Sequence, residues 1–281
     1  MRSRSLTSLL FALFLLHSPS PVLASKILLI AGADENNDLA IQAVLQSQGN
    51  SVTIGPTFSN FTGAGLAGYN AVLLMPNGNY WAQPDMPASG QQALLNFVNN
   101  GGGLVAGEPV LSMNAYPGDF KTLAQGLPAW YAGAGTANSP ITFGTLTSDP
   151  VINAHLPASF SFTATGYYTE SYILPRTNAT AFFSTNQWTS VVGSSFAGNF
   201  GAGAGAAGWN YGAGRVLSLS TFSDNVELGD PNYDRLLANA VNWATQSSGW
   251  SPPPVPAPEP SSIAVFLAAA LGFFAIARKR R

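Results

Sequence analysis

The sequence contains no cysteine and only two histidines, His17 and His155. The absence of cysteine excludes thiol nucleophiles, disulfides and thiolate metal ligands together. Because His17 belongs to the N-terminal leader described below, His155 alone remains for a zinc or iron site or for a Ser-His-Asp triad. We therefore expect no metal site and no cofactor.

Charged side chains are scarce as well. They make up 9% of the 281 residues, whereas about 25% is usual in soluble domains. Between residues 25 and 250, five bases stand against twelve acids, which gives this segment a net charge of about −7. Proteins neutralise nucleic-acid phosphates with Lys and Arg, so this composition excludes nucleic acid as a partner.

The N-terminus has the pattern of a secretory signal peptide. Arg2 and Arg4 precede the apolar run Leu6–Leu16, and Val22 and Ala24 occupy positions −3 and −1 of a cleavage site after Ala24. A run of eleven residues is too short to span a hydrocarbon core of about 30 Å, which argues against an N-terminal membrane anchor. We expect residues 1–24 to direct export through the Sec translocon and to be removed.

The C-terminus combines three features of a stop-transfer tail. Residues 251–260 form a proline-rich spacer that cannot continue as a helix. The apolar run Ile263–Ala277 follows, and four basic residues, 278–281, end the chain. This pattern predicts a single short transmembrane helix within residues 261–281, with its basic end in the cytoplasm and the body of the protein outside.

The tail resembles the PEP-CTERM sorting signal of Gram-negative bacteria through Pro258, Glu259 and Pro260, the apolar helix and the basic end. The resemblance implies cleavage by an exosortase, transient anchoring in the inner membrane, and delivery to the cell surface or the extracellular matrix. It also implies an association with biofilm and exopolysaccharide. A permanent single-pass anchor is the alternative, and the parallel with removed GPI signals favours cleavage.

Residues 25–250 suffice for one hydrophobic core and contain no second linker, so we expect one domain. Its first half alternates apolar runs, typical of buried parallel strands, with helical segments. The predicted strands are Lys26–Ala31, Ser51–Ile54, Ala71–Met75 and Leu104–Gly107. The predicted helices are Asp38–Gln48, which ends at Gly49, and one opened by a capping box at Ser89 and Gln92. This alternation predicts an α/β fold with a doubly wound parallel sheet.

The second half is richer in short strand candidates that Gly, Asn and Pro interrupt. They are Phe160–Tyr168, Ala181–Ser184, Ser190–Gly193, Ala207–Tyr211 and Val216–Thr221. A final helix follows Asp230 as N-cap and Pro231 at its first position, with apolar residues at helical spacing up to Ala244.

The body resembles ThuA-like proteins of the class I glutamine amidotransferase-like superfamily. The segments that carry the resemblance are Lys26–Ala31, Phe97–Val105, Gly214–Leu217 and Leu236–Ala244. The resemblance implies a flavodoxin-like sheet. Amidotransferases of this superfamily place a catalytic Cys at the turn after the fourth strand, and ThuA-like proteins often have a His there. This sequence has Glu108 and Pro109 instead, so the family's chemistry does not carry over with the fold.

Two glycine motifs and His155 have structural interpretations. Gly63–Gly68 and Gly203–Gly208 both match G-x-G-x-x-G, but each leads into a predicted strand instead of opening a helix, as a dinucleotide site requires. We interpret both as turn or flexible glycines. His155 stands between Pro-rich turns, which favours a role in loop packing over that of a catalytic base.

Ligands of open parallel sheets bind beyond the carboxyl ends of the strands, where this sequence places carboxylates, amides and aromatic residues. The residues that follow the predicted strands are Asp34, Glu35, Asn36, Asn37, Asn77, Asn79, Tyr80, Trp81, Glu108 and Asp224. We expect Asp34, Glu35, Asn77, Trp81, Glu108 and Asp224 to form a ligand-binding site. Glu108 would be its centre and its candidate catalytic residue, kept ionised at neutral pH by the positive end of the following helix.

Two functions of the body fit these features. The first is a non-catalytic carbohydrate-binding or scaffold module of an exopolysaccharide matrix, because acids and amides bond hydroxyl groups and aromatic faces stack on sugar C–H groups. The second is a weak saccharide hydrolase that uses two carboxylates at the strand ends. The missing cysteine and the single histidine of the body favour the first.

Overall fold

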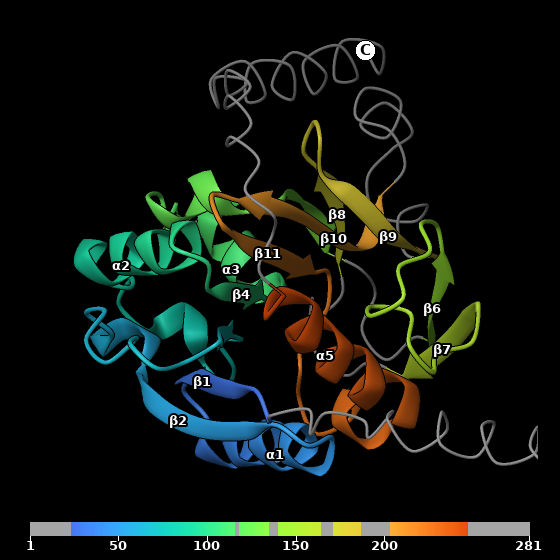
Figure 1. Ribbon diagram of the computed structural model, residues 1–281, viewed down its shortest axis with the longest axis horizontal. Coiled ribbons are helices and arrows are strands. Elements are labelled where there is room, and N and C mark those ends of the chain that lie inside the picture. The colour runs from blue at the N-terminus through green and yellow to red at the C-terminus, as the bar shows by residue number, and fades with distance from the viewer. Residues whose placement is uncertain (1–23, 116–117, 135–139, 164–170, 187–202, 247–281) are drawn as a thin grey trace, which may run out of the picture.

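A computed structural model describes residues 24–115, 118–134, 140–163, 171–186 and 203–246 (Figure 1). The signal peptide, the strand predicted at Ser190–Gly193 and everything from residue 247 onward, including Pro258–Pro260 and the apolar tail, lie outside this part of the chain. Among the described residues, no helix has the length and apolar character needed to cross a membrane.

The described strands form one eleven-stranded sheet. In chain order they are β1 (Lys26–Ala31), β2 (Ser51–Thr57), β3 (Ala71–Leu74), β4 (Gly103–Ala106), β5 (Ala129–Ala134), β6 (Pro140–Thr145), β7 (Ser159–Thr163), β8 (Ser171–Pro175), β9 (Thr180–Thr185), β10 (Ala204–Tyr211) and β11 (Gly214–Leu219). Neighbouring strands follow the order β2-β1-β3-β4-β11-β10-β9-β6-β7, and β8 joins β5 to β10.

The sheet has a parallel half and an antiparallel half. Strands β2, β1, β3, β4 and β11 are mutually parallel. Their order is that of a flavodoxin-like sheet, in which the strand order reverses beside β1. From β10 onward all pairings are antiparallel. The predicted parallel sheet with a β-rich second half is therefore confirmed.

Helices cover both faces of the parallel half. They are α1 (Glu35–Ser47), α2 (Ala88–Asn99), α3 (Glu108–Ala115) and α5 (Pro231–Ala244). Figure 1 shows α1 and α5 on one side of these strands and α2 and α3 on the other. Side chains of β1 alternate accordingly: Ile27 and Leu29 belong to the core under α1 and α5, and Leu28 and Ile30 to the core under α2 and α3.

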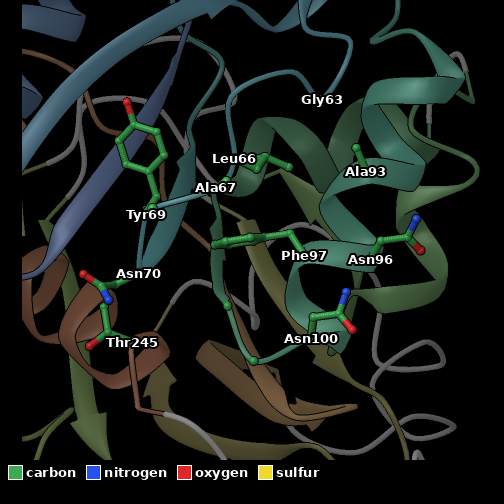
Figure 2. A pocket seen from close by; sticks show the side chains of 13 residues that line it. Gly63, Leu66, Ala67, Tyr69, Asn70, Ala93, Asn96, Phe97, Asn100 and Thr245 are labelled. Atoms are coloured by element: carbon green, nitrogen blue, oxygen red, sulfur yellow. The ribbon is translucent and has the colours of Figure 1, made fainter.

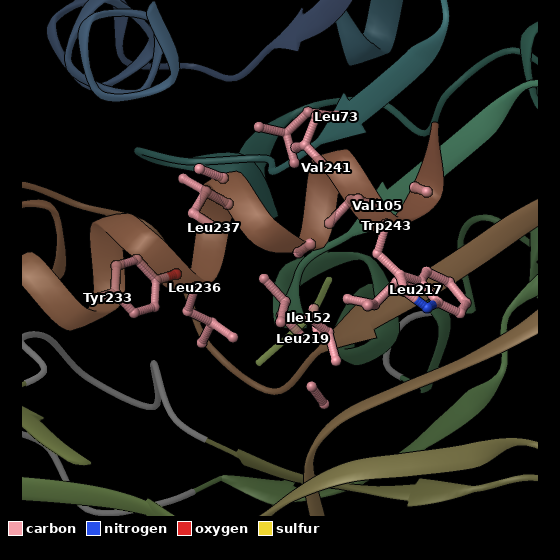
Figure 3. Close-up of a cluster of buried hydrophobic side chains, with 14 of the residues drawn as sticks. Leu73, Val105, Ile152, Leu217, Leu219, Tyr233, Leu236, Leu237, Val241 and Trp243 are labelled. Carbon is pink, nitrogen blue, oxygen red and sulfur yellow. The ribbon is translucent and has the colours of Figure 1, made fainter. Parts of the chain in front are cut away.

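Figure 3 shows the first of these cores, in which Val241 of α5 lies next to Leu73 of β3. Both side chains are fully buried, and each contributes roughly 1.5–3 kcal/mol relative to exposure. The sequence pattern of α5 predicted this buried face. Asp230 caps α5 as predicted, because its Oδ1 accepts hydrogen bonds from the Asn232 and Tyr233 N–H groups at 2.8 and 3.1 Å.

Three local predictions are wrong. The capping box at Ser89 does not form, because α2 begins at Ala88, two residues earlier than a Ser89 cap requires, and its N-cap Pro87 provides no side-chain hydrogen bond. Helix α1 begins at Glu35 instead of Asp38, because Asp34 is its N-cap. The second glycine motif lies in β10 and not in a turn: Cβ atoms at Gly205 and Gly208 would meet the Phe143 and Trp243 rings at 2.6 and 2.8 Å, so both glycines allow aromatic packing.

Candidate ligand-binding site

Strands β1, β2, β3, β4 and β11 end at one edge of the parallel half, called the carboxyl edge below. There Asn77 ties the loop after β3 to the loop after β1. Its Oδ1 accepts a hydrogen bond from the Asp34 N–H at 2.9 Å, and its Nδ2 donates to Asp38 Oδ1 at 2.8 Å. The carboxylate of Asp38 also accepts from the Gly32 N–H. A Cβ at Gly32 would stand 1.9 Å from Asn77 Oδ1, so this junction requires glycine.

The residues of this junction hold the two loops in place. Asn77 is 1% exposed and Asp38 is 3% exposed. Burial raises the pKa of Asp38, although its hydrogen bonds from Gly32 and Asn77 act in the opposite direction. The carboxylate of Asp34 accepts from two backbone N–H groups in the first turn of α1. Asp34 and Asn77, both predicted to bind ligand, therefore serve the local structure.

A pocket of about 550 Å³ opens beside this junction, between the ends of β1 and β2 and the first turns of α1. We call it the carboxyl-edge pocket. Its polar lining residues are Glu35, Asp38, Thr57, Ser59 and Gln83, and its larger apolar ones are Leu39, Ile54 and Phe58. Glu35 and Leu39 lie one helical turn apart on α1 and so share a face. No Lys, Arg or His is among these described lining residues.

An exposed aromatic residue, Trp81, stands two positions before the lining residue Gln83. Trp81 is 49% exposed, whereas its neighbour Tyr80 is buried, with the two ring centroids 5.5 Å apart. The Tyr80 ring also packs 5.6 Å from that of Phe222. Gln83, two residues after Trp81, lines the pocket. The segment thus anchors itself through Tyr80 and leaves the indole of Trp81 accessible at the carboxyl edge.

Glu108 does not line the pocket. It is the first residue of α3 and only 1% exposed, its N–H donates to the Thr221 carbonyl at 3.1 Å, and its Oε2 has no hydrogen-bond partner. Burial raises the pKa of Glu108 to about 8, and a hydrogen bond with Ser112 offsets this only in part. The prediction that Glu108 stays ionised is wrong, because the helix terminus contributes only about 0.3–1 kcal/mol, far less than burial costs a charged carboxylate.

Asp224 also has a local role. It is half-buried, and its Oδ1 accepts a hydrogen bond from the Val226 N–H at 3.0 Å in the turn after β11. Next to it, the Tyr233 hydroxyl contacts the Ser223 hydroxyl at 2.6 Å and donates to the Phe222 carbonyl at 2.6 Å. The Asn37 side chain donates to the Ser223 carbonyl. These contacts join α1 and α5 to the loop after β11.

Of the six residues predicted to bind ligand, Glu35 lines the carboxyl-edge pocket, and Trp81 is exposed two residues before Gln83 of its lining. Thr57, Ser59 and Gln83 were missed. Thr57 and Ser59 lie at and just after the end of β2, the same kind of position that identified Glu35. The pattern ended this strand at Ile54 because Gly55 and Pro56 usually interrupt strands, whereas β2 continues through both to Thr57.

His155 stands apart from this site. It lies in a turn with a φ of +58°, as its predicted place in a loop requires, but its side chain is exposed and not packed as predicted. Within the described part of the chain, no group of three or more His, Asp or Glu residues is arranged to hold a metal ion.

No protein-family model and no curated protein matches this sequence. Solved structures do share its fold. A cytoplasmic protein from Salmonella typhimurium LT2 has a TM-score of 0.56 and 16% identity over 79% of this chain and 100% of its own. A putative ThuA-like protein from Bacteroides uniformis has a TM-score of 0.56 and 16% identity over 81% of this chain and 93% of its own. Another, from Parabacteroides merdae, has a TM-score of 0.54 and 14% identity over 83% and 93%.

These neighbours define the class of fold. The body has a mixed α/β fold with a flavodoxin-like parallel half, and it shares this fold with ThuA-like proteins. At 14–16% identity the likeness concerns the fold alone. What this chain does must therefore be argued from its own residues.

Proposed function

We propose that this chain is an exported protein that an exosortase sorts at its C-terminus, and that its body is a non-catalytic carbohydrate-binding or scaffold module. The proposal for sorting rests on the signal-peptide pattern of residues 1–24 and on the order of Pro258–Pro260, the apolar run and the basic end. Its expected route is transient anchoring in the inner membrane, followed by release to the cell surface or the exopolysaccharide matrix.

The observation that carries the proposal for the body is the chemistry of the carboxyl-edge pocket. It offers a carboxylate, two hydroxyl groups and an amide, from Glu35, Thr57, Ser59 and Gln83, beside the exposed apolar side chain of Leu39. Hydroxyl-rich ligands need both donors and acceptors, and these four groups supply both. Without a Lys or Arg in the lining, an anionic ligand finds no counter-charge. The pocket therefore suits an uncharged sugar.

The same contacts disfavour hydrolysis. Acid–base cleavage of a glycosidic bond needs two carboxyl groups that face the substrate. Of the four nearby acids, Glu108 is buried away from the pocket, Asp34 caps a helix, and Asp38 is held by Gly32 and Asn77. Glu35 is thus the one carboxylate left to meet a ligand. Binding without turnover is the expected behaviour.

Calorimetric titration with uncharged and acidic oligosaccharides tests the body. Glu35→Gln should weaken binding of an uncharged oligosaccharide about tenfold, because a charge-assisted hydrogen bond becomes a neutral one. The matched control is Asn36→Ala, the next residue of α1, which is exposed and does not line the pocket. Release of shortened sugars that Glu35→Gln abolishes would instead establish the hydrolase.

Mass spectrometry of the protein from its native host tests the sorting. The mature form should yield no peptide that contains residues 273–276, because the apolar tail is removed with the sorting signal. An intact tail in the secreted fraction would contradict exosortase processing and leave the proposal for the body untouched.

A further inference from the structure

A second pocket lies at the opposite end of the parallel strands, called the amino edge below (Figure 2). Its volume is about 520 Å³, within the range of small-molecule sites. Three segments form it: the loop before β3, the outer face and end of α2 with the glycines that follow, and the end of α5. The residues that line it are Gly63, Leu66, Ala67, Gly68, Tyr69, Asn70, Ala93, Asn96, Phe97, Asn100, Gly101, Gly102 and Thr245.

This amino-edge pocket contains no charged side chain among its lining residues. Its polar groups are the carboxamides of Asn70, Asn96 and Asn100 and the hydroxyl group of Thr245, whereas the Tyr69 hydroxyl points away from them in Figure 2. A carboxamide both donates and accepts, which is the pairing that a sugar hydroxyl requires. A phosphate, a uronic acid or an ammonium group would lose its hydration here without gaining an opposite charge. The lining thus selects an uncharged, hydroxyl-rich ligand.

Two aromatic rings add an apolar surface. Tyr69 and Phe97 are half-buried and pack against the core under α2. Figure 2 shows Phe97 projecting from α2 toward the segment that carries Ala67 and Tyr69. A Cβ at Gly102 would lie 2.4 Å from the Phe97 ring, so glycine is what lets this ring lie against the backbone. Partly exposed rings held in this way suit the C–H faces of a sugar.

The first glycine motif shapes one wall of this pocket. Gly63, Gly65 and Gly68 all have φ between +83° and +93°, so the loop follows a path that other residues rarely adopt. The loop lies directly on α2 at Gly63, where a Cβ would stand 2.1 Å from that of Ala93. Only glycine allows so close an approach. At Gly68 a Cβ would meet nothing within 4 Å, so the backbone there is open to a ligand. The motif therefore lines the pocket with exposed backbone and does not form a phosphate-binding loop.

We propose that the amino-edge pocket is a second carbohydrate site, which binds a segment of an uncharged polysaccharide. The carboxamides of Asn96 and Asn100 would bond ring hydroxyls while Phe97 and Tyr69 contact the C–H face. This site shares no lining residue with the carboxyl-edge pocket. It can therefore be tested whether or not the first pocket binds sugar.

The test is calorimetric titration of the full chain with a neutral β-glucan hexasaccharide and, for comparison, an alginate hexasaccharide. Asn100→Ala should weaken binding of the neutral probe about 3- to 10-fold, which corresponds to one lost hydrogen bond. Tyr69→Leu keeps an apolar side chain against the core, removes the aromatic face and should weaken binding to a similar degree. Asn210→Ala, an exposed asparagine of β10 outside both pockets, is the matched control and should bind as the unchanged protein does.

The carboxyl-edge variant Glu35→Gln separates the two sites. Two binding events for the neutral probe, one lost with Asn100→Ala and the other with Glu35→Gln, establish the amino-edge site. Loss through Asn100→Ala alone also supports it and overturns the carboxyl-edge site instead. Unchanged affinity for the neutral probe in both Asn100→Ala and Tyr69→Leu overturns the amino-edge site. It is also overturned if alginate binds more tightly than the neutral probe and the same two substitutions weaken alginate binding.

Discussion

Glu108 is the first residue of α3, and its carboxyl group is buried beside Ser112 and Tyr80. Because its pKa in the folded protein is raised to about 8 from an ordinary value of 4.5, the folded state holds a proton that the unfolded chain releases. The contribution of this group to stability is therefore largest below pH 4.5 and falls as the pH rises toward 8, by at most about 1.4 kcal/mol per pH unit.

Glu108→Gln should remove this pH dependence, because the amide is neutral at every pH and keeps the shape of the protonated acid. Urea unfolding at pH 5 and pH 8 measures the effect. The variant should gain stability relative to the unchanged protein at pH 8 and differ little from it at pH 5. If the two proteins lose stability in parallel between these pH values, Glu108 is ionised in the folded state and this account of its burial is wrong.

The sequence located individual polar residues correctly but could not assign their roles. Asp34 and Asn77 do follow their strands, as predicted, but they are committed to backbone N–H groups and to Asp38. Pairing Asn77 with Asp34 and Asp38 depends on the parallel register of β1 and β3, which local pattern does not encode. The same holds for Glu108, whose burial results from residues distant in the chain, such as Tyr80.

Among the helices, α5 provides the most complete agreement between sequence and structure. Asp230 caps it, Pro231 begins it and its apolar face is buried. Asp230→Ala leaves two backbone N–H groups without this acceptor and should lower the unfolding free energy by about 1 kcal/mol. Asp230→Asn keeps an acceptor at the same position and should cost clearly less. Equal losses from both substitutions, measured by urea unfolding, would show that charge and not capping matters here.

The sequence predicted strands correctly where nearly all successive residues of a strand are buried. Strands β1, β3, β4 and β11 are buried on both faces and appear in the sequence as short apolar runs. Strands β5, β6 and β8 were missed. Their sequences contain Pro or Gly, and β6 starts at Pro140 and contains Gly144. These strands are stabilised by antiparallel partners from distant parts of the chain. Their own sequences therefore show only a weak strand pattern.

At the scale of the whole molecule, the two pockets lie at opposite ends of the same parallel strands. The amino edge is also where both ends of the body meet: the Lys26 N–H donates to Asn70 Oδ1 at 2.8 Å, and Asn70 lines the amino-edge pocket together with Thr245. The carboxyl-edge pocket lies at the far end, roughly 20 Å away along a six-residue strand. The last described residues of the body therefore lie at the end opposite to the carboxyl-edge pocket.

If both pockets bind sugar as proposed, a single molecule can hold two polysaccharide chains at once, because the pockets lie at opposite ends of the same strands. We expect the full chain to raise the viscosity of a dilute neutral β-glucan solution, because each bridging molecule adds a cross-link and both ends of the link benefit from high local concentration. Because Glu35→Gln and Asn100→Ala each weaken one of the two sites, each variant should raise the viscosity less than the unchanged protein does at the same concentration, while still binding the glucan through the other site. The Asn210→Ala control should raise viscosity as the unchanged protein does. An increase that survives both single-site variants but vanishes on dilution of the protein at constant glucan would mean that the molecules cross-link by self-association, and the two-site arrangement would then play no part in bridging.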